Sequence, residues 1–198
     1  MRQSSDSSVT LVEATRQGID AALARFFETK RAEVRSISPA SEILVDEVEA
    51  LTMRGGKRLR PIVLAAAHLA VRDDAPLESA IPIGAALELL QSYLLIHDDW
   101  MDGDLTRRGG PAVHASLRRR LGNEHLGDSL GVLAGDLAGT WAWELTLSTP
   151  FPAHRRDAAL AAYARVQVEV YLGQHLDIVA DSDVPRMQDL KTSSYTVR

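Results

Sequence analysis

The chain has 198 residues, of which 45% are hydrophobic and 25% are charged, with a net charge of −5 and no cysteine. This length and composition are typical of a globular protein with one sizeable core. The negative charge gives no electrostatic footprint for nucleic acid. The lack of cysteine excludes disulfides and thiolate metal sites and is compatible with a cytoplasmic location. No apolar run approaches the roughly 20 residues that span a bilayer, so we expect no transmembrane segment.

The elements predicted along the chain are helices nearly throughout. Residues 1–8 are serine-rich and lack the apolar core of a secretory signal, so we expect a disordered tail there. Beyond it, apolar residues recur every three or four positions, and prolines and glycines separate the segments. The predicted helices are 9–35, 40–53, 58–71, 79–100, 111–121, 125–147, 153–179 and 186–196. The sequence therefore predicts an all-α fold, one helical-bundle domain over residues 9–198 with a cavity between facing helices.

Acidic residues cluster at the end of the fourth predicted helix and just beyond it. Asp98 and Asp102 are one helical turn apart on one face, and Asp99 borders that face. Like charges at this spacing repel, and Mg²⁺ prefers oxygen ligands, often one or two carboxylates completed by phosphate oxygens. Arg107 and Arg108 follow and offer planar donor forks to phosphate, which points to a diphosphate substrate. The alternative is a solvated acidic turn.

A second charged motif reads Gly55-Gly56-Lys57-Arg58-Leu59-Arg60-Pro61. Two glycines let the backbone approach a ligand closely, and one helical turn would aim Lys57 and Arg60 at the same anion. Alone, the motif is better explained as a basic loop that caps the next helix, because Pro61 suits a first helical turn.

Together the two motifs resemble those of the trans-isoprenyl diphosphate synthases, the polyprenyl synthetase family. The basic motif resembles the family's homoallylic-substrate motif, and Asp98-Asp99-Trp100-Met101-Asp102 with Arg107-Arg108-Gly109 resembles its first aspartate-rich motif. Gly173-Gln174-His175-Leu176-Asp177 and Lys191-Thr192 resemble two later elements in the same order. The family's second aspartate-rich motif is not found before Arg198. We therefore expect a C-terminally truncated form of an isoprenoid-synthase-type bundle, lacking the C-terminal helices.

The resemblance implies a prenyltransferase that condenses isopentenyl diphosphate with an allylic prenyl diphosphate. It implies Mg²⁺ on Asp98 and Asp102, and contacts from Arg107 and Lys191 to the allylic diphosphate. The residues expected to hold isopentenyl diphosphate are Lys57, Arg60, Gln91 and Arg108. The expected catalytic set is Asp98, Asp99, Asp102, Arg107, Gln174, Asp177, Lys191 and Thr192.

Product length is expected to depend on Tyr93 and Leu94, which precede Asp98 by five and four residues. In this family a bulky aromatic residue five positions before the first aspartate accompanies short products. We therefore expect fifteen- or twenty-carbon chains. The alternative is that Tyr93 merely packs inside the bundle.

Three functions stay open from the sequence. The first is a prenyl-chain elongating synthase, a homodimer by resemblance, of which these 198 residues alone would show little or no turnover. The second is a class I terpene cyclase, which leaves the basic motif unexplained because a cyclase has no second diphosphate to hold. The third is a non-catalytic diphosphate-binding partner subunit that retains half of the site.

Overall fold

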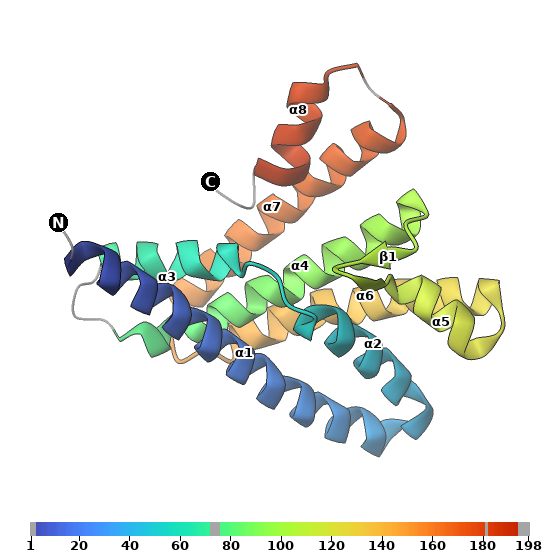
Figure 1. Cartoon of the computed structure of the whole chain (residues 1–198), viewed down its shortest axis with the longest axis horizontal. Coiled ribbons are helices and arrows are strands. Elements are labelled where there is room, and N and C mark those ends of the chain that lie inside the picture. The colour runs from blue at the N-terminus through green and yellow to red at the C-terminus, as the bar shows by residue number, and fades with distance from the viewer. Residues whose placement is uncertain (1–2, 72–75, 181, 194–198) are drawn as a thin grey trace. The chain divides into compact units, whose positions relative to one another are not determined.

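The structure, a computed structural model, describes residues 3–71, 76–180 and 182–193, and these are helical almost throughout (Figure 1). The chain divides into two compact units, Met1–Ser148 and Thr149–Arg198. The all-α class predicted from the sequence is confirmed. The single bundle domain over residues 9–198 stays a prediction.

The described part of the N-terminal unit contains six α-helices and one short β-hairpin. The helices are α1 (Gln3–Ile37), α2 (Glu42–Met53), α3 (Leu59–Val71), α4 (Ile81–Asp102), α5 (Val113–Leu121) and α6 (Glu124–Leu147). The 3-10 turns η1 (Pro39–Ser41) and η2 (Leu77–Ser79) precede α2 and α4. Strands β1 (Thr106–Arg107) and β2 (Gly110–Pro111) pair antiparallel, with Thr106 opposite Pro111.

The C-terminal unit contains α7 (Ala153–Ile178), α8 (Val184–Gln188) and a π-helical turn, η3 (Asp189–Ser193). Both α8 and η3 pack along α7. The sequence predicted one regular helix over 186–196 here, whereas the described part is a short α-helix followed by the π-helical turn. Asp183 caps α8 through a hydrogen bond from the backbone N–H of Arg186 to Oδ1, at 3.1 Å. Residues 194–196 lie outside the described residues.

Helix α1 begins earlier than the sequence predicted. It starts at Gln3, so the described part of the expected tail, residues 3–8, is helical. Serines have modest helix propensity, so the composition of this segment did not predict a helix. The serine-rich composition therefore misplaced the helix start by several residues.

Helix α6 carries a glycine ridge, with glycine at every fourth position of one face: Gly127, Gly131, Gly135 and Gly139. A Cβ on Gly127 would lie 2.4 Å from the backbone N of Arg118 in α5, and one on Gly135 would lie 2.3 Å from Nε2 of His97 in α4. Without side chains on this face, α4 and α5 approach the backbone of α6 closely. The small residues on this face are therefore what permits the close packing of these helices.

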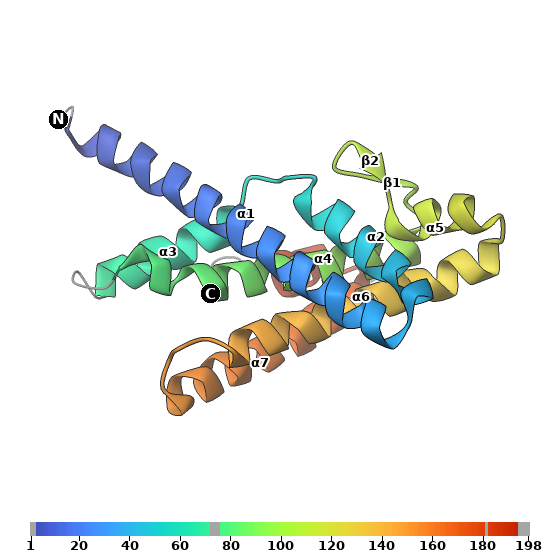
Figure 2. The same ribbon diagram turned by 90° about the horizontal axis from the view of Figure 1, so that it is seen from below.

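Helix α4 is the central helix of the N-terminal unit, and it packs against α1, α2, α3, α5 and α6 (Figure 2). The stretch Leu77–Asp102 is long and apolar enough to cross a membrane by length and composition alone, and 61% of its most apolar 18-residue window is buried. Such burial is typical of a core helix. Glu88, Gln91 and His97 interrupt the apolar run of this stretch, so its sequence does not contain an unbroken apolar segment.

We predict that two alanine substitutions on the glycine ridge differ in their effect on stability. Gly127→Ala forces backbone atoms of α5 to move and should lower the free energy of unfolding by about 1–3 kcal/mol. Gly139→Ala meets Cγ of Tyr93 at 3.2 Å, a contact that a side chain relieves by a small shift. The higher helix propensity of alanine, worth about 1 kcal/mol, should leave that variant near neutral. Urea unfolding of both variants measures the difference, and equal effects would contradict the close packing of α5 on α6.

Candidate functional site

The three motif aspartates occupy the last turns of α4, which ends at Asp102 before Gly103 in the left-handed conformation, with φ 72°. Glycine is the usual residue for such a helix end. Asp98 has 21% of its side chain exposed and Asp102 is exposed, whereas Asp99 is fully buried. The structure therefore separates the motif into two solvent-accessible carboxylates and one internal carboxylate.

Arg107 binds the internal carboxylate. Its Nε donates to Oδ1 of Asp99 at 2.6 Å, and its Nη2 lies 3.6 Å from Asp98 and 3.2 Å from Asp104. The hydrogen bond to Asp99 raises the pKa of Arg107, which therefore stays charged. Burial raises the pKa of Asp99, and the hydrogen bond from Arg107 opposes this shift. Because carboxylates engage this guanidinium here, its expected contact with the allylic diphosphate stays a prediction.

The basic motif forms a loop between α2 and α3 rather than a helical turn. Gly55 and Gly56 have φ of 92° and 146°, and Arg58 has φ of 48°, so the backbone is not helical before Leu59. Lys57 is exposed in this loop, whereas Arg60 lies half-buried in the first turn of α3. Lys57 and Arg60 therefore do not share a helical turn, and the expectation that one such turn aims both at the same anion is wrong.

Arg58 has a structural role that the sequence did not reveal. Its guanidinium, 3% exposed, pairs with Glu88 of α4, 5% exposed, and with Asp20 of α1 at 2.8 Å. It also donates to the carbonyl of Thr52 at 3.0 Å. Arg58 therefore fixes the loop on the bundle. Its charge is already paired with the carboxylates of Glu88 and Asp20.

The β1–β2 hairpin brings Arg108 against the glycine loop. Arg108 and Gly109 form its turn, with φ of 52° and 72°. A Cβ on Gly56 would lie 3.4 Å from Cζ of Arg108, so the guanidinium lies directly over this glycine. Its Nη1 donates to the carbonyl of Leu51 at 3.4 Å, a long hydrogen bond. Two basic segments about fifty residues apart in the sequence thus meet.

Electrostatics at Arg108 favour a bound anion. Burial lowers the pKa of this guanidinium, Glu88 opposes that shift, and the nearby Arg58, Arg107 and Arg60 lower the pKa further. A cluster of like charges in a partly buried place is unfavourable by itself, and a phosphate group relieves the repulsion. Arg58 and Arg107 in this group are paired with carboxylates, and Arg108 is a candidate for binding a diphosphate.

Three predicted residues of α4 lie nearer its middle. Gln91 is buried, and its Oε1 has no hydrogen-bond partner among the residues that the structure describes. The ring of Tyr93 lies over Gly139 and edge-to-face with His97, at 4.8 Å between centroids. Leu94 is half-buried. The packing contact of Tyr93 is thus established, and its effect on product length stays a prediction.

The later motif elements meet one another in the C-terminal unit. Nζ of Lys191 in η3 donates to Oδ2 of Asp177 in α7. A Cβ on Gly173 would lie 2.5 Å from the backbone N of Lys191, so this glycine lets η3 pack closely on α7. Gln174 is buried, and the side chain of Thr192 lies outside the described residues. The predicted residues therefore form two groups, one in each unit.

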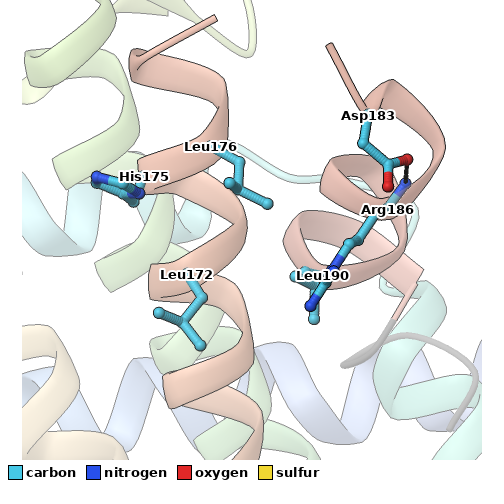
Figure 3. Close-up of a pocket in the computed structure, with 6 residues that line it drawn as sticks. All are labelled: Leu172, His175, Leu176, Asp183, Arg186 and Leu190. Atoms are coloured by element: carbon cyan, nitrogen blue, oxygen red, sulfur yellow. Dashed lines mark hydrogen bonds between the residues drawn. The ribbon is translucent and has the colours of Figure 1, made fainter. Parts of the chain in front are cut away.

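A cavity of about 360 Å³ lies between α7 and the α8–η3 segment. Figure 3 shows the six residues that line it: Leu172, His175, Leu176, Asp183, Arg186 and Leu190. None of the expected substrate-binding or catalytic residues is among them. The cavity is therefore a feature of the C-terminal unit apart from the predicted site.

The acidic end of α4 suits a magnesium ion that binds together with a phosphate. Among the residues described, no three histidine or carboxylate side chains gather into a metal site. Asp98 and Asp102 provide two carboxylates on one helical face, and Mg²⁺ commonly takes one or two carboxylates while phosphate oxygens and water complete its shell. This donor set fits Mg²⁺ bound with a diphosphate.

Comparison with known proteins identifies the family. Residues 41–197 match the polyprenyl synthetase family, so the chain belongs to it, as the motifs indicated. The short chain isoprenyl diphosphate synthase of Methanocaldococcus jannaschii is 32% identical over 157 residues, which cover 79% of this chain and 44% of that protein. The geranylgeranyl diphosphate synthase of Methanosarcina mazei is 34% identical over 182 residues, 88% of this chain and 50% of that protein. The chain thus spans about half the length of these curated relatives.

Solved structures support the same assignment. Geranylgeranyl pyrophosphate synthase from Corynebacterium glutamicum, complexed with isoprenyl diphosphate and magnesium, superposes with a TM-score of 0.81 at 28% identity. The match covers 93% of this chain and 57% of that chain. The fold is therefore that of the isoprenyl synthases.

We predict that Arg107→Ala lowers the free energy of unfolding by about 3 kcal/mol, because it leaves the Asp99 carboxylate buried without its cation. Asp99→Asn in the same chain should recover most of this loss. Asp104→Asn is the matched control, since it removes a carboxylate that is 55% exposed and should cost less than about 1 kcal/mol. Urea unfolding of the four proteins decides, and an equal cost for Arg107→Ala and Asp104→Asn would contradict the internal pair.

Proposed function

We propose that the chain carries the isopentenyl diphosphate site and the first magnesium-binding motif of a short-chain isoprenyl diphosphate synthase, a prenyltransferase. The contact of Arg108 with the glycine loop carries this proposal, because it gathers arginines from two segments at one place. Relatives named as farnesyl, geranylgeranyl and geranylfarnesyl diphosphate synthases support a short product.

In this function Lys57, Arg60, Gln91 and Arg108 hold isopentenyl diphosphate. Lysine and arginine supply charge-assisted hydrogen bonds to the diphosphate, and the buried Gln91 supplies a polar group at the wall of α4. Because the Leu51 carbonyl and the glycine loop hold the Arg108 guanidinium in place, it would stabilise charge with little reorganisation. The loop geometry set by Gly55 and Gly56 gives the substrate access to the backbone.

The allylic diphosphate is expected at the end of α4. Asp98 and Asp102 would hold Mg²⁺ there, and Arg107 keeps Asp99 compensated behind them. When bound, Mg²⁺ supplies Lewis-acid stabilisation of the charge on the leaving diphosphate. The allylic C–O bond breaks, a C–C bond forms from the isopentenyl double bond, and a proton leaves with the diphosphate. No side-chain nucleophile is required.

The remaining roles belong to the proposal as well. Lys191 would contact the allylic diphosphate, with Asp177 as its partner in the present structure. Gln174 and Thr192 complete the expected catalytic set. A homodimer and a cytoplasmic location are further parts of the proposed function.

We predict that the chain binds isopentenyl diphosphate without metal, and that Lys57→Ala together with Arg60→Ala weakens binding at least about 100-fold. Each lost charge-assisted hydrogen bond should contribute about 1.5–3 kcal/mol. Titration calorimetry measures the affinity. Arg25→Ala with Arg119→Ala is the matched control, because it removes two exposed positive charges from other surfaces. Equal binding by both double variants would contradict the site.

A prenyl-transfer assay on the same protein sample tests the activity. It uses labelled isopentenyl diphosphate, a set of allylic diphosphates and Mg²⁺. Little or no elongation is expected from the 198 residues alone, since the second aspartate-rich motif of the family is not among them. If isopentenyl diphosphate binds but is not elongated, either by the 198 residues or by a longer form that carries that motif, the partner-subunit function is favoured. Consumption of an allylic diphosphate without isopentenyl diphosphate would favour a cyclase.

We predict that Tyr93→Ala, made in a form of the protein that turns over, lengthens the product by at least one five-carbon unit. Its ring fills the space between α4 and Gly139, five residues before the first aspartate. Chromatography of the products measures the chain length. An unchanged product would show that Tyr93 acts in helix packing alone.

A further inference from the structure

Arg54, the first residue after α2, belongs to neither charged motif, but it directly precedes the glycine loop and contacts the hairpin that carries Arg107 and Arg108. Its Nη1 donates to the carbonyls of Arg107 at 3.1 Å and of Pro111 at 2.7 Å. Its Nε donates to the carbonyl of Ala50 in α2 at 3.1 Å. One side chain therefore joins the end of α2 to both strands of the hairpin, immediately before the glycine loop begins.

Gly110 provides the space for this contact. A Cβ at Gly110 would lie 2.3 Å from Nη1, 2.8 Å from Cζ and 2.9 Å from Cδ of Arg54, and these are the three nearest atoms. The φ of Gly110 is not in the left-handed region, so its backbone suits any residue. Glycine is therefore required here for the passage of the Arg54 side chain and not for the turn itself.

The hairpin needs such a contact because its own charges oppose its position. Arg108 lies close to Arg58 and Arg60 of the basic motif, and this repulsion contributes to the lowered pKa of Arg108. The pair of Arg107 with Asp99 holds the hairpin to α4. The hydrogen bonds of Arg54 go to neutral carbonyls, so they hold the hairpin to α2 without neutralising the cations that would bind phosphate.

We propose that Arg54 is a positioning residue for the diphosphate site, which sets the place of Arg108 relative to the glycine loop. This inference rests on the proposed function, since it concerns the same site. Arg54 acts through its hydrogen bonds to the hairpin backbone, and Gly110 leaves the space that the Arg54 side chain needs to make them.

The test measures the affinity for isopentenyl diphosphate without metal by titration calorimetry. Arg54→Ala is expected to weaken binding about tenfold, and Arg54→Lys should recover part of this loss because an ammonium can reach the Pro111 carbonyl. Gly110→Ala should weaken binding by a similar factor, since its methyl group displaces the guanidinium. Arg119→Ala, an exposed arginine on α5, is the control for charge and should bind as the unaltered chain does.

The double variant is the sharpest measurement. With Arg54→Ala in place, the methyl group of Gly110→Ala has room, so the double variant should bind no more weakly than Arg54→Ala alone. Hydrogen exchange at the amides of residues 106–110 should be faster in Arg54→Ala and Gly110→Ala, while their thermal unfolding stays close to that of the unaltered chain.

Two results overturn the inference. One is unchanged affinity in Arg54→Ala, and the other is a loss on Gly110→Ala that is equally large with and without Arg54. Either leaves the proposed function standing, provided that the unaltered chain binds isopentenyl diphosphate. Failure of the unaltered chain to bind would refute the proposed function itself, and hairpin exchange would still report whether Arg54 holds the hairpin.

Discussion

The buried ion pair between Arg58 and Glu88 is the constraint on which the site depends. Both charges are almost fully removed from water. Losing Arg58 would leave the Glu88 carboxylate buried without its ion-pair partner, whereas Arg58 also pairs with Asp20. Such pairs specify position more than they stabilise a fold. Here the pair fixes the basic loop on α4 ten residues before Asp98, roughly 15 Å along the helix. The distance between the two charged motifs is thereby set by one rigid element.

Acidic and basic residues gather at different places along α4, and each group includes one residue of the opposite charge. Arg107 lies among the carboxylates at the end of α4, while Glu88 lies among the arginines near the loop. In the proposed function, a magnesium diphosphate would bind at the acidic group and a second diphosphate at the basic group.

The sequence predicted the helices well because their periodicity and turn residues are local signals. It also predicted which aspartates share a face, since helical geometry determines that directly. It placed Lys57 in a helix wrongly, because the positive φ of Arg58 depends on tertiary contacts with Glu88 and Asp20. The roles of Arg54 and Gly173 were missed for the same reason. No local sequence pattern indicates that an arginine donates to backbone carbonyls, or that a glycine allows another segment's backbone to pack against it.

The glycine ridge extends this dependence to a helix that contributes no group to the proposed chemistry. It removes side chains from one face of α6 over roughly 18 Å, and it contacts α4 at one end and α5 at the other. Since α4 precedes the hairpin and α5 follows it, both chain ends of the segment that carries Arg107 and Arg108 are positioned by α6. Enlarging Gly127 or Gly135 would therefore shift an end of the segment that carries Arg107 and Arg108 while every charged side chain remained present.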